Sequence, residues 1–317
     1  PNSPDANLGI AMCLLTQGKF SEGWKYYKWR FEGKNLSKIH NEIINIPKAK
    51  DIEDLKNKKL LIFCEQGLGD IILFSRYLKI LLSYNSKIFF KAPKPLINIL
   101  KTLDNKIIVD KDLPKDKKFD YYCSLIDIPI ILNSTLESIP SFKRYLYPKN
   151  EYLNKWKNDI NTDFYNVAIC WRGSDILEGR WIPIELFNKL SLIKNIRLIS
   201  IQKADEKYAL DKKILDTSNI IHFENKLDIK ESFADTAAII ELCDLVITVD
   251  TSIAHLSGAL GSKVFLLLEK YPAWFWLLDS KKTKWYPNTT IYRQNQSGNW
   301  KNIFNNLYKD LKKITKT

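Results

Sequence analysis

Short apolar runs alternate with amphipathic segments along most of the chain, the pattern of a sheet built from parallel strands. In the first half, strands are predicted at 60–63, 87–90, 107–109 and 121–125, with a helix from about 71 to 82. In the second half, strands are predicted at 167–170, 196–201, 220–221, 245–249 and 264–268, and helices near 183–190, 233–242 and 252–259. Each half therefore predicts an open α/β sheet, and 317 residues are enough for two such domains.

Both ends of the chain predict helices. The first thirty-odd residues form a hairpin that breaks at Gly18, with apolar faces made of Leu8, Ala11, Leu15, Phe20, Trp24, Tyr27 and Trp29. Residues 300–314 predict a closing helix, and a charged segment at 148–162 is the expected hinge. The predicted domains are the hairpin at 1–45, an N-terminal lobe at 46–150 and a C-terminal lobe with the closing helix at 151–317.

The net charge of +13 favours nucleic-acid binding at first sight. Its lysines are spread over every predicted helix face, so we expect no nucleic-acid partner. The five cysteines show no CxxC or metal spacing and are expected to be small core residues in a reducing compartment. We also expect no transmembrane segment and a cytoplasmic location, free or at the inner face of the membrane. Because the chain begins at Pro1 without a Met, we expect a fragment of a longer protein.

The most informative stretch follows the wholly apolar strand at 245–249, where Asp250 leads into a helix of small residues. Backbone N–H groups at such a helix start face the carboxyl edge of the sheet and can hold an anion. The candidate binding residues here are Asp250, Thr251, Ser252, Ala254 and His255. The alternative is that Asp250 or Thr251 only caps the helix, and that His255 is a half-buried residue satisfied within the protein.

Segment 245–261 resembles the Asp-Thr/Ser-x-x-x-His nucleotide-binding turn of the heptosyltransferase-like (glycosyltransferase family 9-like) enzymes. Three further stretches resemble the subgroup in which such a domain follows tetratricopeptide (TPR) repeats, namely 65–70, 233–238, and 274–276 followed by 285–287. The N-terminal hairpin is similar to a last TPR unit. The resemblance implies an α/β GT-B fold of two facing Rossmann-like lobes preceded by a TPR-like hairpin, and a glycosyltransferase that uses a nucleotide-sugar.

One TPR unit cannot bury its own apolar face. Either further TPR repeats precede Pro1, or the hairpin packs on the body that follows it. A simple N-terminal helical cap is the other interpretation.

On the acceptor side, the resemblance points to the turn after the first strand, with candidates Glu65, Gln66, Gly67 and Gly69. The two glycines are expected to give a tight turn with room for a substrate. The resemblance implies that Asp70 is the general base of an inverting displacement. The alternative is that Asp70 stabilises the helix dipole or only orients the acceptor, and Glu65 is the reserve base.

The departing nucleoside diphosphate needs positive charge close to it. Heptosyltransferases use a lysine just before a Trp-Pro-like segment, and Arg180 occupies that place here. An arginine can clamp phosphate with two hydrogen bonds, so Arg180 is the second catalytic candidate. Arg172, Gln202 and Lys203 are further nucleotide-binding candidates, and Arg172 could equally be a surface residue. No metal is expected, because arginine and the helix N-terminus replace the cation.

Three smaller interpretations complete the prediction. Asp235 and Thr236 precede a helix, where capping is favoured over contact with the nucleotide. The aromatic run at 274–276 is expected in the core, with a sugar pocket as the alternative. His40 and His222 have no acidic or metal partner nearby in sequence.

The leading hypothesis is a metal-independent, inverting glycosyltransferase whose acceptor is a protein, a glycan or a lipid. One alternative is a catalytically inactive nucleotide-binding or protein-interaction module with the same fold. A nucleic-acid binder is the third.

Overall fold

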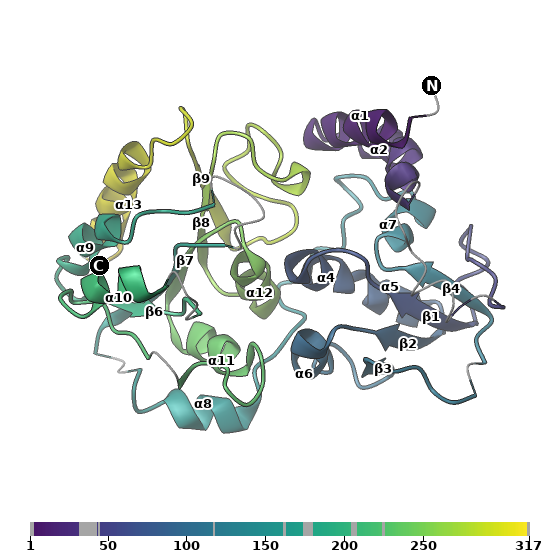
Figure 1. The fold of residues 1–317 in the computed structure, drawn as a ribbon, viewed down its shortest axis with the longest axis horizontal. Helices are drawn as coiled ribbons and strands as arrows, with labels where there is room; N and C mark the ends of the chain where they lie inside the picture. Colours follow the sequence, from purple (N-terminus) through teal and green to yellow (C-terminus); the bar gives the residue numbers. More distant parts are fainter. Residues whose placement is uncertain are drawn as a thin grey trace. The chain divides into compact units, whose positions relative to one another are not determined.

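The computed structural model describes residues 3–31, 43, 45–116, 118–160, 163–173, 180–203, 208–223 and 226–315. These residues pack as two compact units (Figure 1). Unit 1 takes in the residues up to Phe142 and the later segment Ala273–Ser280, and unit 2 takes in Lys143–Pro272 and the residues from Lys281 onward. The predicted limits 1–45, 46–150 and 151–317 stay predictions, and no local pattern signals that 273–280 returns to unit 1.

Unit 1 contains a four-stranded sheet within the described residues, in the order β3-β2-β1-β4 with every pair parallel. Its strands are β1 (Lys59–Phe63), β2 (Lys87–Lys91), β3 (Ile107–Asp110) and β4 (Tyr121–Ser124). The predicted parallel α/β arrangement of this half is confirmed. Phe63 is in register with Ser124, so the carboxyl ends of β1 and β4 lie side by side. The short helices around this sheet are α6 (Ile97–Leu100), with the 3-10 turn η2 (Lys94–Leu96) before it, and α7 (Asp127–Ile131).

The helix predicted from about 71 to 82 is two helices, α4 (Leu68–Ser75) and α5 (Tyr77–Ser83). The junction is Arg76, whose side chain is fully buried. Its guanidinium donates to the backbone oxygens of Leu73 at 2.8 Å and Pro140 at 3.2 Å. A buried arginine needs such acceptors, and one of them is a carbonyl in the last turn of α4.

The N-terminal hairpin consists of α1 (Pro4–Thr16), α2 (Phe20–Tyr27) and the 3-10 turn η1 (Lys28–Phe31), drawn in purple in Figure 1. Gly18 joins the helices with φ of +80°, and a Cβ there would lie 2.7 Å from Leu136 Cδ1. The buried face of α1 is Asn7, Ala11 and Leu15. Leu8 was expected on this face but is half-buried, and the buried residue is Asn7, one position earlier. Trp29 is likewise half-buried, and the buried residue is Arg30, one position later.

The hairpin packs on the segment η4 (Trp274–Trp276) through aromatic rings. The ring centroid of Trp274 lies 5.5 Å from that of Phe20, 5.6 Å from that of Trp24 and 6.2 Å from that of Phe74. Trp274–Trp276 are all buried, which confirms the core interpretation. The hairpin is therefore an integral part of unit 1, whereas its TPR-like character and any upstream repeats stay predictions.

Unit 2 contains a five-stranded parallel sheet within the described residues, in the order β6-β5-β7-β8-β9. Its strands are β5 (Tyr165–Cys170), β6 (Ile196–Ser200), β7 (Leu245–Val249), β8 (Val264–Leu268) and β9 (Thr289–Arg293). β9 was not predicted, because this edge strand begins with two threonines and lacks an apolar run. The strand predicted at 220–221 is a single bridge between Ile199 and Ile221.

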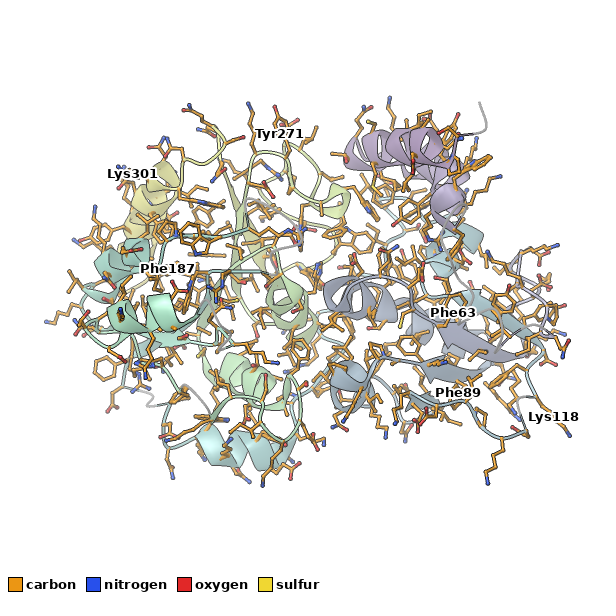
Figure 2. The ribbon with its side chains drawn as sticks, viewed as in Figure 1. Phe63, Phe89, Lys118, Phe187, Tyr271 and Lys301 are labelled. Atoms are coloured by element: carbon orange, nitrogen blue, oxygen red, sulfur yellow. The ribbon has the colours of Figure 1, made fainter. Side chains whose placement is uncertain are left out.

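The helices of unit 2 are α8 (Asn150–Trp156), α9 (Glu185–Ser191), α10 (Tyr208–Leu215), α11 (Ala234–Leu242), α12 (Ser252–Leu260) and α13 (Lys301–Ile314). α8 lies beside α11, and α13 lies beside α9, where the rings of Phe187 and Phe304 meet edge to face at 4.9 Å (Figures 1 and 2). Segment 148–162 is thus largely occupied by a helix packed within unit 2, and its role as a hinge stays a prediction.

The five cysteines are free thiols, and their burial differs from the expectation. Cys123 and Cys170 are buried, Cys64 and Cys243 are half-buried, and Cys13 is exposed on α1. The core assignment was wrong for Cys13, because it lies on the outer face of the hairpin. None of the helices in the described ranges combines the length and the apolar character that a membrane span requires.

Candidate functional site

The carboxyl edge of the unit 2 sheet collects polar residues from neighbouring strands. β7 runs between β5 and β8, and all five of its residues are buried. Asp250 follows β7 directly, and Glu269 follows β8 directly. Because the carboxyl ends of parallel strands share one edge, these residues and the loop after β5 gather at a single place.

The N-terminus of α12 lies at this edge and is capped by a residue of the chain itself. Thr251 is the N-cap of α12, in extended conformation, and its Oγ1 accepts the backbone N–H of Ile253 at 3.1 Å. Capping by Thr251 is therefore confirmed. A threonine hydroxyl can still donate its hydrogen, and Ser252 opens the first turn, where unpaired N–H groups are expected. Ala254 is buried in that turn and presents only a methyl group.

Arg180 and Asp250 form an ion pair, with 3.2 Å between Nη2 and Oδ2. The Asp250 side chain is 7% exposed and that of Arg180 is 21% exposed. A Cβ on Gly173 would lie 3.2 Å from Thr251 Cγ2 and 3.6 Å from Arg180 Cβ, so the loop after β5 is packed closely against the start of α12. Arg180 Nε is buried and makes no hydrogen bond to any described residue. A buried donor without a partner is uncommon in a folded protein and marks this end of Arg180 as a place for a ligand acceptor.

Glu269 is a member of this cluster that the sequence reasoning missed. Burial raises the pKa of its carboxyl group, Arg180 lowers it and Asp250 raises it. Arg180 and Asp250 are therefore close enough to Glu269 to influence its titration. The position of Glu269 directly after an apolar strand, like that of Asp250, was the signal that could have revealed it.

His255 is more buried than a side chain that contacts a ligand is expected to be. It is 2% exposed, and its Nδ1 lies 3.1 Å from the hydroxyl oxygen of Tyr286. Tyr286 lies in turn 3.5 Å from the hydroxyl of Tyr145. A phosphate contact from His255 would have to use Nε2, and the paired Nδ1 favours the interpretation of His255 as satisfied within the protein.

Two of the three further nucleotide-binding candidates have structural partners. Arg172 is buried, with Nη1 3.4 Å from Asp211 Oδ2. Asp211 also accepts the indole N–H of Trp171 at 2.9 Å. Gln202 Oε1 accepts the backbone N–H of Arg172 at 3.1 Å and so ties the end of β6 to the end of β5. Lys203 is exposed, and of the three it is the one that solvent reaches.

The start of α11 differs from the prediction. The N–H groups of Asp235 and Thr236 are capped by Asp228 Oδ1, at 2.8 and 3.1 Å. Asp235 instead accepts the indole N–H of Trp156 at 2.7 Å and the ammonium group of Lys155 at 2.6 Å. The favoured capping interpretation was wrong, because Asp235 points to α8 and is 2% exposed.

His222 has an acidic partner that lies six positions away in sequence, with 3.2 Å between its Nε2 and Asp216 Oδ1. His40 lies outside the described residues. Among those that are described, no group of three His, Cys, Asp or Glu side chains is arranged to hold a metal ion.

The acceptor-side candidates lie at the carboxyl end of β1, in unit 1. Gly67 is the N-cap of α4 with φ of −65°, and Gly69 lies in the first helical turn. Neither residue has positive φ, so the backbone here does not need glycine for its conformation, and the tight turn with room for a substrate stays a prediction. Asp70 stands in the same turn, where a carboxylate is stabilised by the helix dipole. A Cβ on Gly67 would lie 3.4 Å from Asp70 Oδ2, and Gln66 is half-buried beside it.

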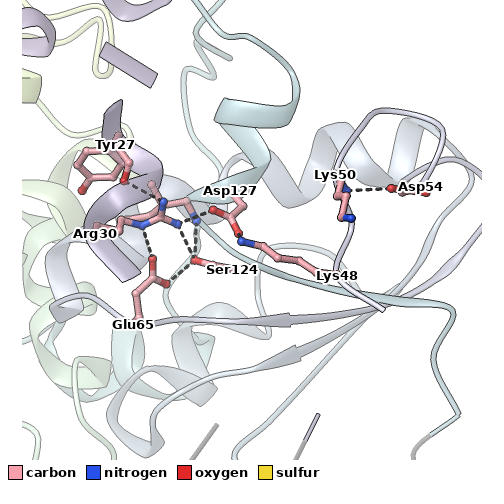
Figure 3. A network of polar contacts seen from close by, with 9 residues as sticks. Tyr27, Arg30, Lys48, Lys50, Asp54, Glu65, Ser124 and Asp127 are labelled. Carbon is pink, nitrogen blue, oxygen red and sulfur yellow. Dashed lines mark hydrogen bonds and ion pairs between the residues drawn. The ribbon is translucent and has the colours of Figure 1, made fainter. Parts of the chain in front are cut away.

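Glu65 is engaged in a buried ionic network, shown in Figure 3. Arg30 Nε lies 3.0 Å from Glu65 Oε1, and Arg30 Nη2 lies 2.6 Å from Asp127 Oδ1. Ser124 donates its hydroxyl to Glu65 Oε2, and Lys48 Nζ is 3.1 Å from Asp127 Oδ2. Both oxygens of Glu65 thus have partners, which makes it a poor candidate for a general base.

Arg30 joins this network from the N-terminal hairpin. Burial alone lowers the pKa of its guanidinium, but Asp127 and Glu65 more than offset that and raise the pKa above its usual value. Tyr27 is buried close by, which raises its pKa; Arg30 lowers that pKa, and Asp70 and Glu65 raise it. Asp70 therefore lies within electrostatic reach of the hairpin.

No family model matches the chain. The protein FlbA of Caulobacter vibrioides is 24% identical over an alignment of 330 positions, which takes in 95% of this chain and 54% of FlbA. The chain thus spans about half the length of this relative.

Solved structures are similar in fold. The glycosyl transferase family 9 protein from Veillonella parvula has a TM-score of 0.58 at 13% identity, with 76% of this chain and 87% of that one covered. The E. coli ADP-heptose LPS heptosyltransferase II has a TM-score of 0.60 at 12% identity, with 80% of this chain and 97% of that one covered. The E. coli heptosyltransferase WaaC with ADP has a TM-score of 0.55 at 11% identity, with 80% of this chain and 99% of that one covered. The two parallel sheets of this chain therefore have the fold of the family 9 heptosyltransferases.

Proposed function

We propose that this protein is a glycosyltransferase that moves a sugar from a nucleotide-diphosphate-sugar to an acceptor, with inversion and without a metal ion. The observation that carries the proposal is the Arg180–Asp250 pair beside the start of α12, at the carboxyl edge of a parallel sheet. The fold shared with heptosyltransferases, one of which was solved with ADP, supports this assignment.

In the proposed donor site, Arg180 and the first N–H groups of α12 stabilise the charge that grows on the departing diphosphate. Arg180 Nε and the exposed part of the guanidinium are the donors, and a phosphate would share Arg180 with Asp250. Asp250 and Glu269 can accept hydrogen bonds from sugar hydroxyls. These positive groups come from the chain itself, and for this reason we propose a metal-independent reaction.

In the proposed acceptor site, Asp70 takes the proton of the attacking hydroxyl or amine. Glu65 is held by Arg30 and Ser124, and this pairing supports Asp70 over Glu65 as the base. The acceptor is a protein, a glycan or a lipid.

Donor binding is tested by thermal shift against ADP, GDP, UDP and CDP, since a ligand that binds the folded state raises its melting temperature. We expect one diphosphate, with ADP the first to try, to raise the melting temperature of the wild type. Arg180→Met should abolish most of that rise. Arg144→Met is the matched control, because Arg144 also pairs with a carboxylate of unit 2, Glu241. An equal loss in both variants would show that the Arg180 effect is not specific to the site.

Transfer is tested separately, with the nucleotide-sugar whose diphosphate binds and with protein, glycan and lipid acceptors. Asp70→Asn should keep diphosphate binding and lower turnover by about 10²- to 10⁴-fold. Unchanged turnover in Asp70→Asn would remove Asp70 from the mechanism. A diphosphate that binds tightly, with no transfer and no donor hydrolysis by the wild type, would favour the inactive nucleotide-binding module instead.

A further inference from the structure

A hollow of about 830 Å³ lies in unit 2, between the segment after Arg180 and the loop after β9. We call it the Trp181 hollow. One side is formed by Trp181, Pro183, Glu185 and Leu186, and the other by residues 296–301. Its size is that of a small-molecule site. Figure 2 labels Lys301 at the start of α13, where the second side ends.

Trp181 is a large aromatic side chain with 53% of its surface exposed, held on a fixed backbone. It pairs with Arg172 in an antiparallel bridge. On either side of that bridge, Gly173 N–H donates to the Arg180 oxygen at 3.1 Å, and Ile182 N–H donates to the Trp171 oxygen at 2.9 Å. A tryptophan fixed in this way offers an apolar ring face at little cost in entropy.

The opposite side of the hollow offers hydrogen-bonding groups. The side chains of Gln296, Ser297 and Asn299 supply amide and hydroxyl donors and acceptors, and Glu185 adds a carboxylate. Across the described ranges, none of these four side chains is hydrogen-bonded to another residue.

The loop that carries these groups is preorganised. Gly298 has φ of +78°, and its N–H donates to Oε1 of the buried Gln294 at 3.1 Å. The backbone N–H of Asn299 donates to the backbone oxygen of Gln296 at 3.1 Å. A loop held in this way loses little freedom when it binds a ligand.

The hollow is distinct from the proposed donor site. Successive residues of an extended segment point to opposite faces. Because Arg180 points to Asp250, its neighbour Trp181 points away from the α12 start. A nucleotide bound at Arg180 would therefore not stack on Trp181.

We propose that the Trp181 hollow is a second, non-catalytic binding site for a neutral saccharide. One apolar face of a sugar ring lies on the Trp181 indole, and its hydroxyls bond to Gln296, Asn299 and Glu185. An aromatic face opposite side-chain amides fits a polyhydroxylated ring, which has an apolar face and many hydroxyls. The charges of Glu185 and Lys301 cancel, which favours a neutral ligand over a charged one.

The test is ¹⁹F NMR of protein labelled with 5-fluorotryptophan, with the Trp181 resonance assigned from a Trp181→Phe variant. The probes are methyl glycosides of neutral hexoses and N-acetylhexosamines at millimolar concentration, with ADP and UDP as the nucleotide arm. We expect at least one glycoside to shift the Trp181 resonance and the nucleotides to leave it in place. Asn299→Ala, which keeps the indole, should weaken that glycoside about tenfold. Tyr271→Ala, at another exposed aromatic of unit 2, should not.

The proposal is overturned if no glycoside moves the Trp181 resonance of the folded protein, or if only the nucleotides move it. It is also overturned if Asn299→Ala and Tyr271→Ala bind the glycoside equally well. No nucleotide-sugar is present in this assay and the Trp181 resonance reports on the hollow alone, so the outcome is independent of the proposed transfer activity.

Discussion

Arg30 and Glu65 form an ion pair, with 3.0 Å between Nε and Oε1, that joins the N-terminal hairpin to the turn after β1. The Arg30 side chain is 1% exposed and that of Glu65 is 7% exposed. Two charges removed from water to this extent stabilise the fold only when each keeps its partners. The hairpin thus supplies the buried counter-charge of Glu65 at the carboxyl edge of the unit 1 sheet, and Asp127 shares Arg30 with Lys48.

Replacing Arg30 with Met should destabilise unit 1 strongly. The change leaves Glu65 and Asp127 without the guanidinium that bridges them, and loss of one partner of a buried pair costs about 3–5 kcal/mol. The measurement is the urea midpoint of unfolding. Lys28→Met, at an exposed position on the same 3-10 turn, is the control and should change the midpoint little. Equal effects of the two changes would mean that the network contributes nothing specific.

Replacing Trp274 with Ala should also destabilise unit 1. Trp274 fills the space between the hairpin and α4, and its ring touches those of Phe20, Trp24 and Phe74. Removal of a large buried aromatic side chain costs about 3–5 kcal/mol. Thermal unfolding checks the result, with Tyr271→Ala as the control, because Tyr271 is 69% exposed three positions away. A melting temperature of Trp274→Ala close to that of the control would contradict this packing role.

The strands were predicted well where burial makes them continuously apolar. β7 and β8 have the predicted bounds, since both are flanked by strands on each side and all their residues are buried. β9 lies at the sheet edge, where a strand does not need an apolar run, so local periodicity could not reveal it. Hydrophobic pattern thus predicts the centre of these sheets better than their edges.

The sequence predicted residues of the candidate site that lie in the segments after recognisable strands. Asp250 and Arg180 were named from the sequence, and the structure brings them together in one ion pair. The partners that lie far apart along the chain had no local signal. Glu65 pairs with Arg30 across 35 positions, and Asp235 pairs with Trp156 across 79. Such pairings depend on tertiary packing, which overrides the local preference for capping at Asp235.

Replacing Glu269 with Gln should make stability less dependent on pH. Burial and Asp250 raise the pKa of Glu269 above its usual value of 4.5, although Arg180 opposes them. The folded state therefore binds this proton more tightly than the unfolded state, and the contribution of Glu269 to stability is complete below pH 4.5 and is lost as pH rises through the raised pKa. The variant should gain melting temperature over the wild type at pH 7, and gain less at pH 4.

The control for this experiment is Glu151→Gln, which removes a carboxylate with an exposed side chain from the same unit. It should change the melting temperature little at either pH. If Glu269→Gln shifts the melting temperature equally at pH 4 and pH 7, the carboxyl group of Glu269 is not responsible for the pH dependence.

Replacing Gly258 with Ala should disturb the donor edge through packing alone. A Cβ at this position of α12 would lie 2.3 Å from Cδ1 and 2.4 Å from Cγ of Tyr286, whose ring is fully buried. The Tyr286 hydroxyl is the partner of His255 Nδ1, so a displaced ring also breaks that contact. Overpacking of this kind costs about 1–3 kcal/mol, although alanine is the better helix former.

Gly9→Ala is the matched comparison, because Gly9 is also within a helix and its Cβ would meet no atom within 4 Å. At Gly9 only the higher helix propensity of alanine acts, and the substitution should stabilise the protein by about 0.5–1 kcal/mol. The two substitutions are chemically identical, so opposite signs of the change in melting temperature isolate the contact with Tyr286. A stabilising effect at both positions would show that the Tyr286 ring can move aside.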